Sequence, residues 1–210
     1  MIRLAAYFVS LLYLSGCVPE ERLYGYAVGY GRSYPEPIQV HVPTNAPVIT
    51  QQFRHEKFLS ETSTGAHNAH WGLDIHAPVG TPVIAAAPGV ITRSFWEPAY
   101  GHQIEVTHPP DLSGVSSSTR YMHLHKRLVS KGELIKRGEQ IGELGASGFL
   151  TGGFAHLHFE VLFRGARYRV NAADPNLFWV NGLGEVTCFE EKHRSISNQE
   201  LKLIYPVICQ

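Results

Sequence analysis

Short runs of alternating apolar and polar residues recur along the chain from residue 48 to about residue 161. Side chains two positions apart on a β-strand point to the same face, so this alternation predicts strands with one buried face. Turn residues such as Pro88-Gly89 separate the runs, and no stretch predicts a helix of any length. We expect strands at 48–53, 72–75, 81–87, 90–96, 102–108, 119–124 and 155–161. This spacing predicts a mainly β fold, an antiparallel sheet or sandwich.

The run 155–161 places two histidines on one strand face. His156 and His158 alternate with Leu157 and Phe159, which we expect to face a core. Two adjacent imidazoles on a rigid strand can bind a metal or transfer protons. An H-x-H pair alone is a weak signal and also fits exposed histidines on an edge strand. The Gly-rich run at 145–153 lets the backbone approach a ligand closely.

A second group of such residues lies upstream, at His70 and Asp74. Their i, i+4 spacing puts both on one face of a helix or of a strand, and Gly72 and Pro78 disfavour the helix. In a strand, Gly72 would lie between them and leave space for an ion. With a second histidine they form a ligand set that suits zinc and leaves a fourth position open. Alone, the pair also fits a surface hydrogen bond.

A third group of such residues, His123 and His125, lies at the end of the strand predicted at 119–124 and just after it. His123 and His125 share one face of it, and we interpret His125 as solvent-exposed.

The length of 210 residues allows one domain of ordinary size together with tails. The 18 basic and 18 acidic residues balance, so no electrostatic footprint indicates a nucleic-acid partner. Residues 17–47 are rich in Tyr, Gly and Pro, and we interpret them as a tether; packing on the domain and glycan stacking are alternatives.

Residues 1–16 have the pattern of an export signal, with Arg3 ahead of an apolar stretch at 4–14. That stretch is shorter than the about 20 residues that a spanning helix needs. The end, 14–17, resembles the lipobox of bacterial lipoproteins, in which the peptide is cut before the cysteine and the cysteine is acylated. The resemblance implies a lipid anchor at Cys17 in the membrane of the cell envelope. By resemblance to lipoproteins of bacteria with two membranes, Val18 in place of Asp after the cysteine implies transfer to the outer membrane, on its periplasmic face. The alternative is an ordinary secretory signal.

Two further cysteines, Cys188 and Cys209, lie in a C-terminal extension at 181–210. In an exported chain, two remaining cysteines predict a disulfide. Neither has the C-x-x-C spacing of a metal ligand.

The three histidine groups together resemble the lysostaphin/LytM-type zinc peptidases, the M23 peptidase family. The motifs are His70-x-Gly-x-Asp74, Tyr121-x-His-Leu and His156-x-His158, with further matches at 80–85, 89–90, 138–142 and 174–175. The resemblance covers roughly residues 48–178. It implies a LytM-type fold, similar to the duplicated hybrid motif, in a domain at 48–180. Two segments depart from the family's pattern, at 54–69 and 113–118. We expect both to flank the groove that binds the substrate.

The resemblance implies one zinc ion per chain held by His70, Asp74 and His158, with His156 and His123 as catalytic residues. It implies hydrolysis of peptide bonds in peptidoglycan cross-links or stems. No H-E-x-x-H motif supplies a glutamate base, so histidine would transfer the protons. We expect His156 as the base and His123 at the oxyanion or the leaving amine, or the reverse. Glu160 would orient an imidazole or be a plain surface residue.

Two other functions are compatible with this fold. One is a non-catalytic regulator that binds peptidoglycan or activates amidases, which the retained ligands and the lack of heptads disfavour. The other is a protease of proteins, which an envelope location disfavours. Protein activators are not predicted.

Overall fold

The computed structural model describes residues 24–27, 32–35, 38–54, 69–112, 114–164, 170–197 and 199–210. Within these residues the chain forms strands joined by turns and short 3-10 helices. The strands are β1 (Tyr24–Ala27), β2 (Arg32–Pro35), β3 (Val48–Gln51), β4 (Leu73–His76), β5 (Pro82–Ile84), β6 (Gly89–Glu97), β7 (Gly101–Thr107), β8 (Ser117–Leu124), β9 (Lys126–Arg127), β10 (Leu134–Ile135), β11 (Gln140–Glu143), β12 (Leu157–Arg164) and β13 (Val170–Ala173). The 3-10 helices are η2 (Phe149–Thr151), η3 (Pro175–Leu177) and η4 (Glu191–Ser195).

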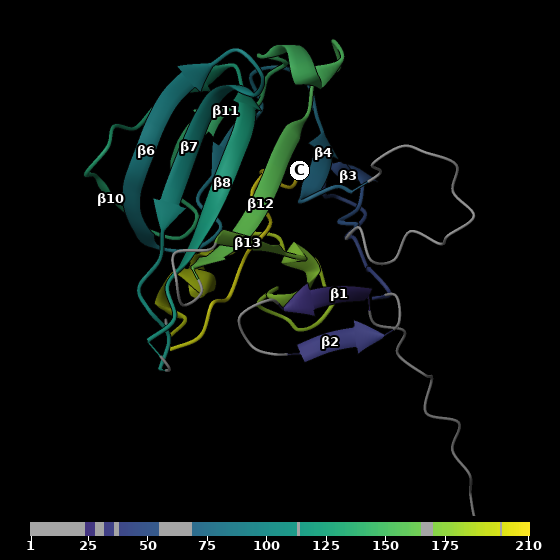
Figure 1. The fold of residues 1–210 in the computed structure, drawn as a ribbon, viewed down its shortest axis with the longest axis vertical. Helices are drawn as coiled ribbons and strands as arrows, with labels where there is room; N and C mark the ends of the chain where they lie inside the picture. Colours follow the sequence, from purple (N-terminus) through teal and green to yellow (C-terminus); the bar gives the residue numbers. More distant parts are fainter. Residues whose placement is uncertain are drawn as a thin grey trace, which may run out of the picture.

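An eight-stranded sheet dominates the fold, with the order β10-β6-β7-β8-β12-β4-β3 and β13 paired to β12. Every pairing in it is antiparallel, as the alternating pattern predicted. A smaller sheet, β5-β11-β9, lies behind β6, β7 and β8 (Figure 1). The mainly β fold class is therefore confirmed, and β12, which carries His158 and directly follows His156, lies between β8 and β4.

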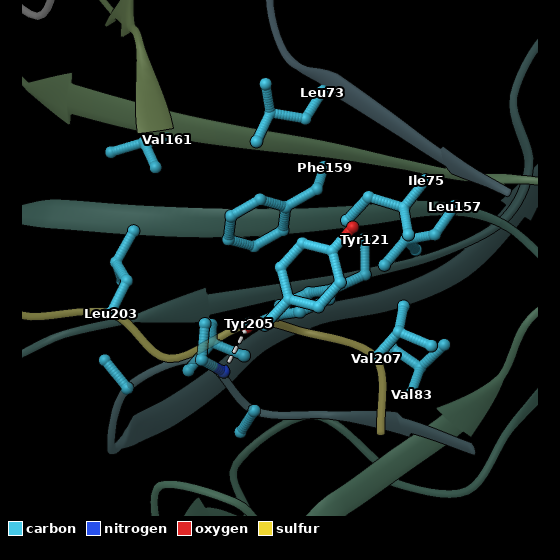
Figure 2. Packing of buried hydrophobic residues seen from close by; sticks show 14 of the residues in the cluster. Leu73, Ile75, Val83, Tyr121, Leu157, Phe159, Val161, Leu203, Tyr205 and Val207 are labelled. Atoms are coloured by element: carbon cyan, nitrogen blue, oxygen red, sulfur yellow. Dashed lines mark hydrogen bonds between the residues drawn. The ribbon is translucent and has the colours of Figure 1, made fainter. Parts of the chain in front are cut away.

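The core is formed by the inward side chains of the large sheet, the smaller sheet and the C-terminal segment. Leu73, Tyr121, Leu157 and Phe159 are fully buried in it and belong to one cluster with Tyr205 (Figure 2). Burying a side chain of this size stabilises the fold by about 1.5–3 kcal/mol. Because strand residues alternate between faces, the core fixes the direction of the polar side chains on the outer face.

The C-terminal segment, which the sequence places outside the peptidase-like domain, contributes directly to this core. Leu203, Tyr205 and Val207 alternate inward, and the backbone amide of Ile204 donates to the carbonyl of Ala86 at 3.0 Å. Fully buried Arg137 donates to backbone carbonyls of the same segment. The predicted disulfide between Cys188 and Cys209 is present.

The predicted tether, 17–47, contains the antiparallel hairpin of β1 and β2. Its last part lies on the domain, because Ile38 is buried and His41 bridges to Glu185. Cys17 and the predicted signal lie outside the described residues. None of the helices in the described part of the chain has the length and apolarity to cross a membrane.

Candidate active site

The register of β12 against β4 brings His158 and Asp74 together. The two residues are direct cross-strand partners, and His158 Nδ1 lies 2.7 Å from Asp74 Oδ1. Leu157 and Phe159 point into the core, as predicted, so His158 is held on the outer face. His156 immediately precedes β12 and lies on the same side, with its Nε2 3.8 Å from Asp74 Oδ1.

His70 reaches the same point from outside β4. Its backbone pairs with Arg54 as an isolated bridge, and its Nδ1 donates to the carbonyl of Gln52 at 2.9 Å. Since a carbonyl can only accept, Nδ1 holds the proton of the neutral ring and Nε2 keeps its lone pair, whereas the protonated ring also donates through Nε2. That Nε2 lies 3.1 Å from Asp74 Oδ1 and 3.2 Å from His158 Nδ1.

Gly72 has a different role from the one expected. We expected its missing side chain to leave space for an ion. A Cβ there would lie 2.4 Å from the carbonyl oxygen of Phe159, so glycine is required for the backbone to pass close to β12. The expectation was wrong because the sequence does not reveal which strand lies against the motif.

The donor atoms of His70, Asp74 and His158 fit a zinc ion. Tetrahedral ligands at about 2.0–2.1 Å from zinc lie about 3.3 Å from one another. The three atoms here are separated by 2.7–3.2 Å. They are two imidazole nitrogens and one carboxylate oxygen, and they form the one group of possible metal ligands among the described residues.

The charges of this cluster favour a cation between the three side chains. Burial by itself would raise the pKa of Asp74, but hydrogen bonds from His158 and His70 outweigh it and hold that pKa well below its usual range. Burial opposes protonation of His158, yet its bonds to Asp74 and Glu160 raise its pKa to about 9. An anionic carboxylate thus stabilises positive charge at this point.

A row of charged side chains leads away from His158 across the outer face. His158 Nε2 lies 3.3 Å from Glu160 Oε1, and Glu160 Oε2 lies 3.2 Å from Arg120 Nη1. Arg120 also pairs with Glu105 at 3.3 Å. Because Glu160, Arg120 and Glu105 are successive cross-strand partners, the sheet itself holds the row in line.

His123 and His156 face each other beside the cluster, with ring centroids 4.8 Å apart. His123 Nδ1 donates to the carbonyl of Ser147 at 2.9 Å, and His156 Nδ1 donates to that of Phe154 at 3.0 Å. Both rings therefore carry an unprotonated Nε2 when neutral. Burial lowers the pKa of His123 to about 4, although the bond to Ser147 opposes this.

The backbone of His123 has a φ of 62°, in the left-handed region that residues other than glycine rarely adopt. Such conformations persist where the surrounding structure imposes them, and they concentrate at functional sites. His123 lies within β8, where the register between β7 and β8 shifts between the pairs His102–Leu124 and Ile104–Tyr121. The sequence pattern predicted the strand at this position but gave no sign of this irregularity.

Other predicted site features lie elsewhere. His125 is exposed, as interpreted from the sequence. The expectation that 113–118 flanks the groove was wrong: Ser117 and Ser118 begin β8, whereas His123 lies near its other end, about 20 Å along the strand. The segment 55–68 lies outside the described residues.

Tyr100, which no motif in the sequence indicated, contributes to the site. Its ring centroid lies 5.8 Å from that of His123 and 6.4 Å from that of His158. Burial and the nearby Glu160 and Glu97 raise its pKa. Its position depends on the β6–β7 hairpin, which a linear motif cannot show.

Comparisons with known proteins agree with the motifs. The sequence model of Peptidase family M23 matches residues 68–171. The peptidoglycan DD-endopeptidases ShyC and ShyA of Vibrio cholerae are 42% identical over 102 residues and 39% identical over 108 residues. These alignments cover 49% and 51% of this chain but only 22% and 23% of the two relatives.

Two solved structures are similar to part of the chain. The catalytic domain of lysostaphin from Staphylococcus simulans is 34% identical, with a TM-score of 0.43, over 51% of this chain and 76% of that one. A zinc-containing peptidase from Vibrio cholerae is also 34% identical, with a TM-score of 0.48, over 65% of this chain and 40% of that one.

Proposed function

Because the chain belongs to peptidase family M23, we propose that it is a zinc-dependent endopeptidase that hydrolyses peptide bonds in peptidoglycan cross-links or stems. The observation that carries the proposal is the convergence of three zinc-type donor atoms with two further histidines whose Nε2 atoms are unprotonated when the rings are neutral. The relatives named as peptidoglycan DD-endopeptidases support this substrate.

His70, Asp74 and His158 would hold the ion. When bound, zinc polarises a scissile carbonyl and lowers the pKa of a water molecule at its open position. His156 would take the proton of the attacking water through Nε2, since its Nδ1 is engaged with Phe154. His123 would serve the oxyanion or the leaving amine in its protonated form, with a proton taken up on Nε2, because Nδ1 holds the proton of the neutral ring toward Ser147. The opposite assignment of these two histidines uses the same atoms.

We further propose that the protein works from a lipid anchor. The leader and the lipobox-like 14–17 support acylation of Cys17. The proposed location is the periplasmic face of the outer membrane, where peptidoglycan lies within reach. Metabolic labelling with a palmitate analogue tests this directly, because a Cys17→Ser variant is expected to lose the label.

Hydrolysis is tested with the purified chain and isolated peptidoglycan. We expect loss of cross-linked muropeptides by mass spectrometry, inhibition by a chelator and recovery on addition of zinc. The masses of the products identify the bond that is cut. A regulator without catalytic activity would leave all cross-links intact in every condition, and a protease of proteins would instead degrade casein.

A further inference from the structure

Two hollows extend from the candidate active site along β4. The first has a volume of about 310 Å³ and reaches the site directly, because Asp74 and His156 form part of its wall. The second, of about 280 Å³, lies beside Asn45, Pro78 and Thr81. His76 lines both of them, so it stands where one hollow meets the other.

His76 follows Asp74 by two residues on β4 and therefore shares its face of the strand. Its Nδ1 lies 2.8 Å from the carbonyl oxygen of Ala155. A carbonyl only accepts, so Nδ1 carries the proton and the neutral ring keeps a lone pair on Nε2. The side chain is exposed, which leaves this acceptor available to a ligand.

The walls of the first hollow indicate what it accommodates. Thr50, Gln51 and Thr151 supply neutral polar groups, and the ring of Phe154 is 75% exposed. Among the described residues, no lysine or arginine lines either hollow. The surface therefore suits a neutral or cationic chain with hydrogen-bond donors better than an anionic one.

We propose that these hollows form a subsite for the peptide of the substrate next to the scissile bond, and that His76 Nε2 accepts a hydrogen bond from it. The donor is an amide N–H or an ammonium group of the peptide. The inference rests on the proposed function, because the occupant is the peptide of peptidoglycan. His76 binds the substrate in this scheme and takes no part in proton transfer.

A merely structural role for His76 predicts a different pattern of effects. Its bond to Ala155 ties β4 to the residue before His156, and loss of that bond would disturb the site. Asparagine at position 76 keeps an N–H near Nδ1 but offers no atom near Nε2. Glutamine places its amide near Nε2 and loses the inner N–H. The two substitutions therefore separate the two roles.

The test uses the full zinc-loaded chain and an uncross-linked disaccharide-peptide monomer from muramidase-digested peptidoglycan. Calorimetry gives its Kd, and mass spectrometry verifies that the ligand stays intact. We expect His76→Asn to weaken binding by about three- to tenfold, the value of one neutral hydrogen bond. His76→Gln is expected to stay within about twofold of the wild type. His125→Asn, at an exposed histidine outside both hollows, is the matched control.

Several results would overturn the subsite: His76→Asn binding as tightly as wild type, His76→Gln binding more weakly than His76→Asn, or a wild type that binds no peptide. Turnover of cross-linked dimers is measured separately. A wild type that binds the monomer with the expected variant pattern but cuts no dimer contradicts the proposed function and leaves the subsite standing. A wild type that cuts dimers with no effect of His76→Asn contradicts only the subsite.

Discussion

His158 Nε2 lies 3.3 Å from Oε1 of Glu160, two residues further along the same strand. This contact orients the ring: with a metal bound, Nε2 would carry the proton toward the carboxylate, and Nδ1 would be left for the cluster with Asp74 and His70. His70 shows the opposite arrangement, because its Nδ1 donates to the carbonyl of Gln52 and its Nε2 faces the cluster. Each imidazole is thus fixed by a hydrogen bond on the side away from the cluster.

Glu160→Gln is expected to weaken zinc binding by about tenfold, since partners that orient metal-bound histidines typically contribute 10–100-fold in affinity. Competition with a chromophoric chelator measures the dissociation constant. Glu143→Gln removes a carboxylate that pairs with Lys126 away from the cluster, and it is the matched control. Equal zinc affinities of the two variants would mean that Glu160 is a plain surface residue with respect to the metal.

Asp74→Asn is expected to abolish both zinc retention and hydrolysis. The substitution preserves size and shape but removes the anion that holds two imidazoles at 2.7 and 3.1 Å. Metal content after dialysis is measured by atomic emission, and circular dichroism verifies the fold. Stoichiometric zinc in this variant would contradict the ligand set.

Much of this site could be predicted from the sequence because strand periodicity is local. Alternation alone places His156 and His158 on one face and Leu157 in the core, as found. The pairing of Asp74 with His158 depends on the register between strands 84 residues apart, and local periodicity carries no information on it. The resemblance to the family motifs brought the two residues together, because it assigns both of them to one zinc site.

Features created by turns and long-range packing were not predictable in this way. The positive φ of His123 and the position of Tyr100 depend on contacts with other segments. The C-terminal segment has short apolar runs in its sequence, yet only the fold shows that Tyr205 enters the core of the large sheet. Gly72 likewise has its role set by the backbone of Phe159.

Buried His108 is expected to make stability depend on pH. Burial lowers its pKa to about 4, against the opposing bond to the carbonyl of Pro88. Below about pH 6.5 the unfolded chain binds a proton that the folded chain does not, so stability decreases as the pH falls from 6.5 toward 4. The expected loss between pH 7 and pH 5 is about 2 kcal/mol.

Urea unfolding of metal-free protein at both pH values measures this loss. His108→Asn keeps an N–H for Pro88 and cannot titrate, so its stability is expected to change less over the same interval. The difference between the two proteins isolates His108 from other titrating groups. Identical pH dependence in both would contradict a buried neutral histidine.

The disulfide between Cys188 and Cys209 is expected to stabilise the whole domain, since the 21-residue separation includes segments that pack in the core. Closing a loop of this size contributes about 3 kcal/mol in the chain-entropy model. A Cys188→Ser/Cys209→Ser variant should therefore unfold at lower urea, and added reductant should lower the midpoint of the wild type alone. An unchanged midpoint would show that the core holds this segment without the bond.

His123→Ala and His156→Ala are expected to retain zinc and to lose turnover by about 10² or more, the usual effect of removing a general acid or base. Neither ring is needed for the cluster, because both have Nδ1 engaged with a backbone carbonyl and neither supplies one of the three closest donor atoms. Zinc content and kcat on cross-linked muropeptides are measured on the same preparation. Loss of the metal from His123→Ala would reverse the assignment, because that ring would then be a ligand. Full turnover in either variant would place the proton transfer on another group, for which Tyr100 is a candidate because its ring lies beside those of His123 and His158.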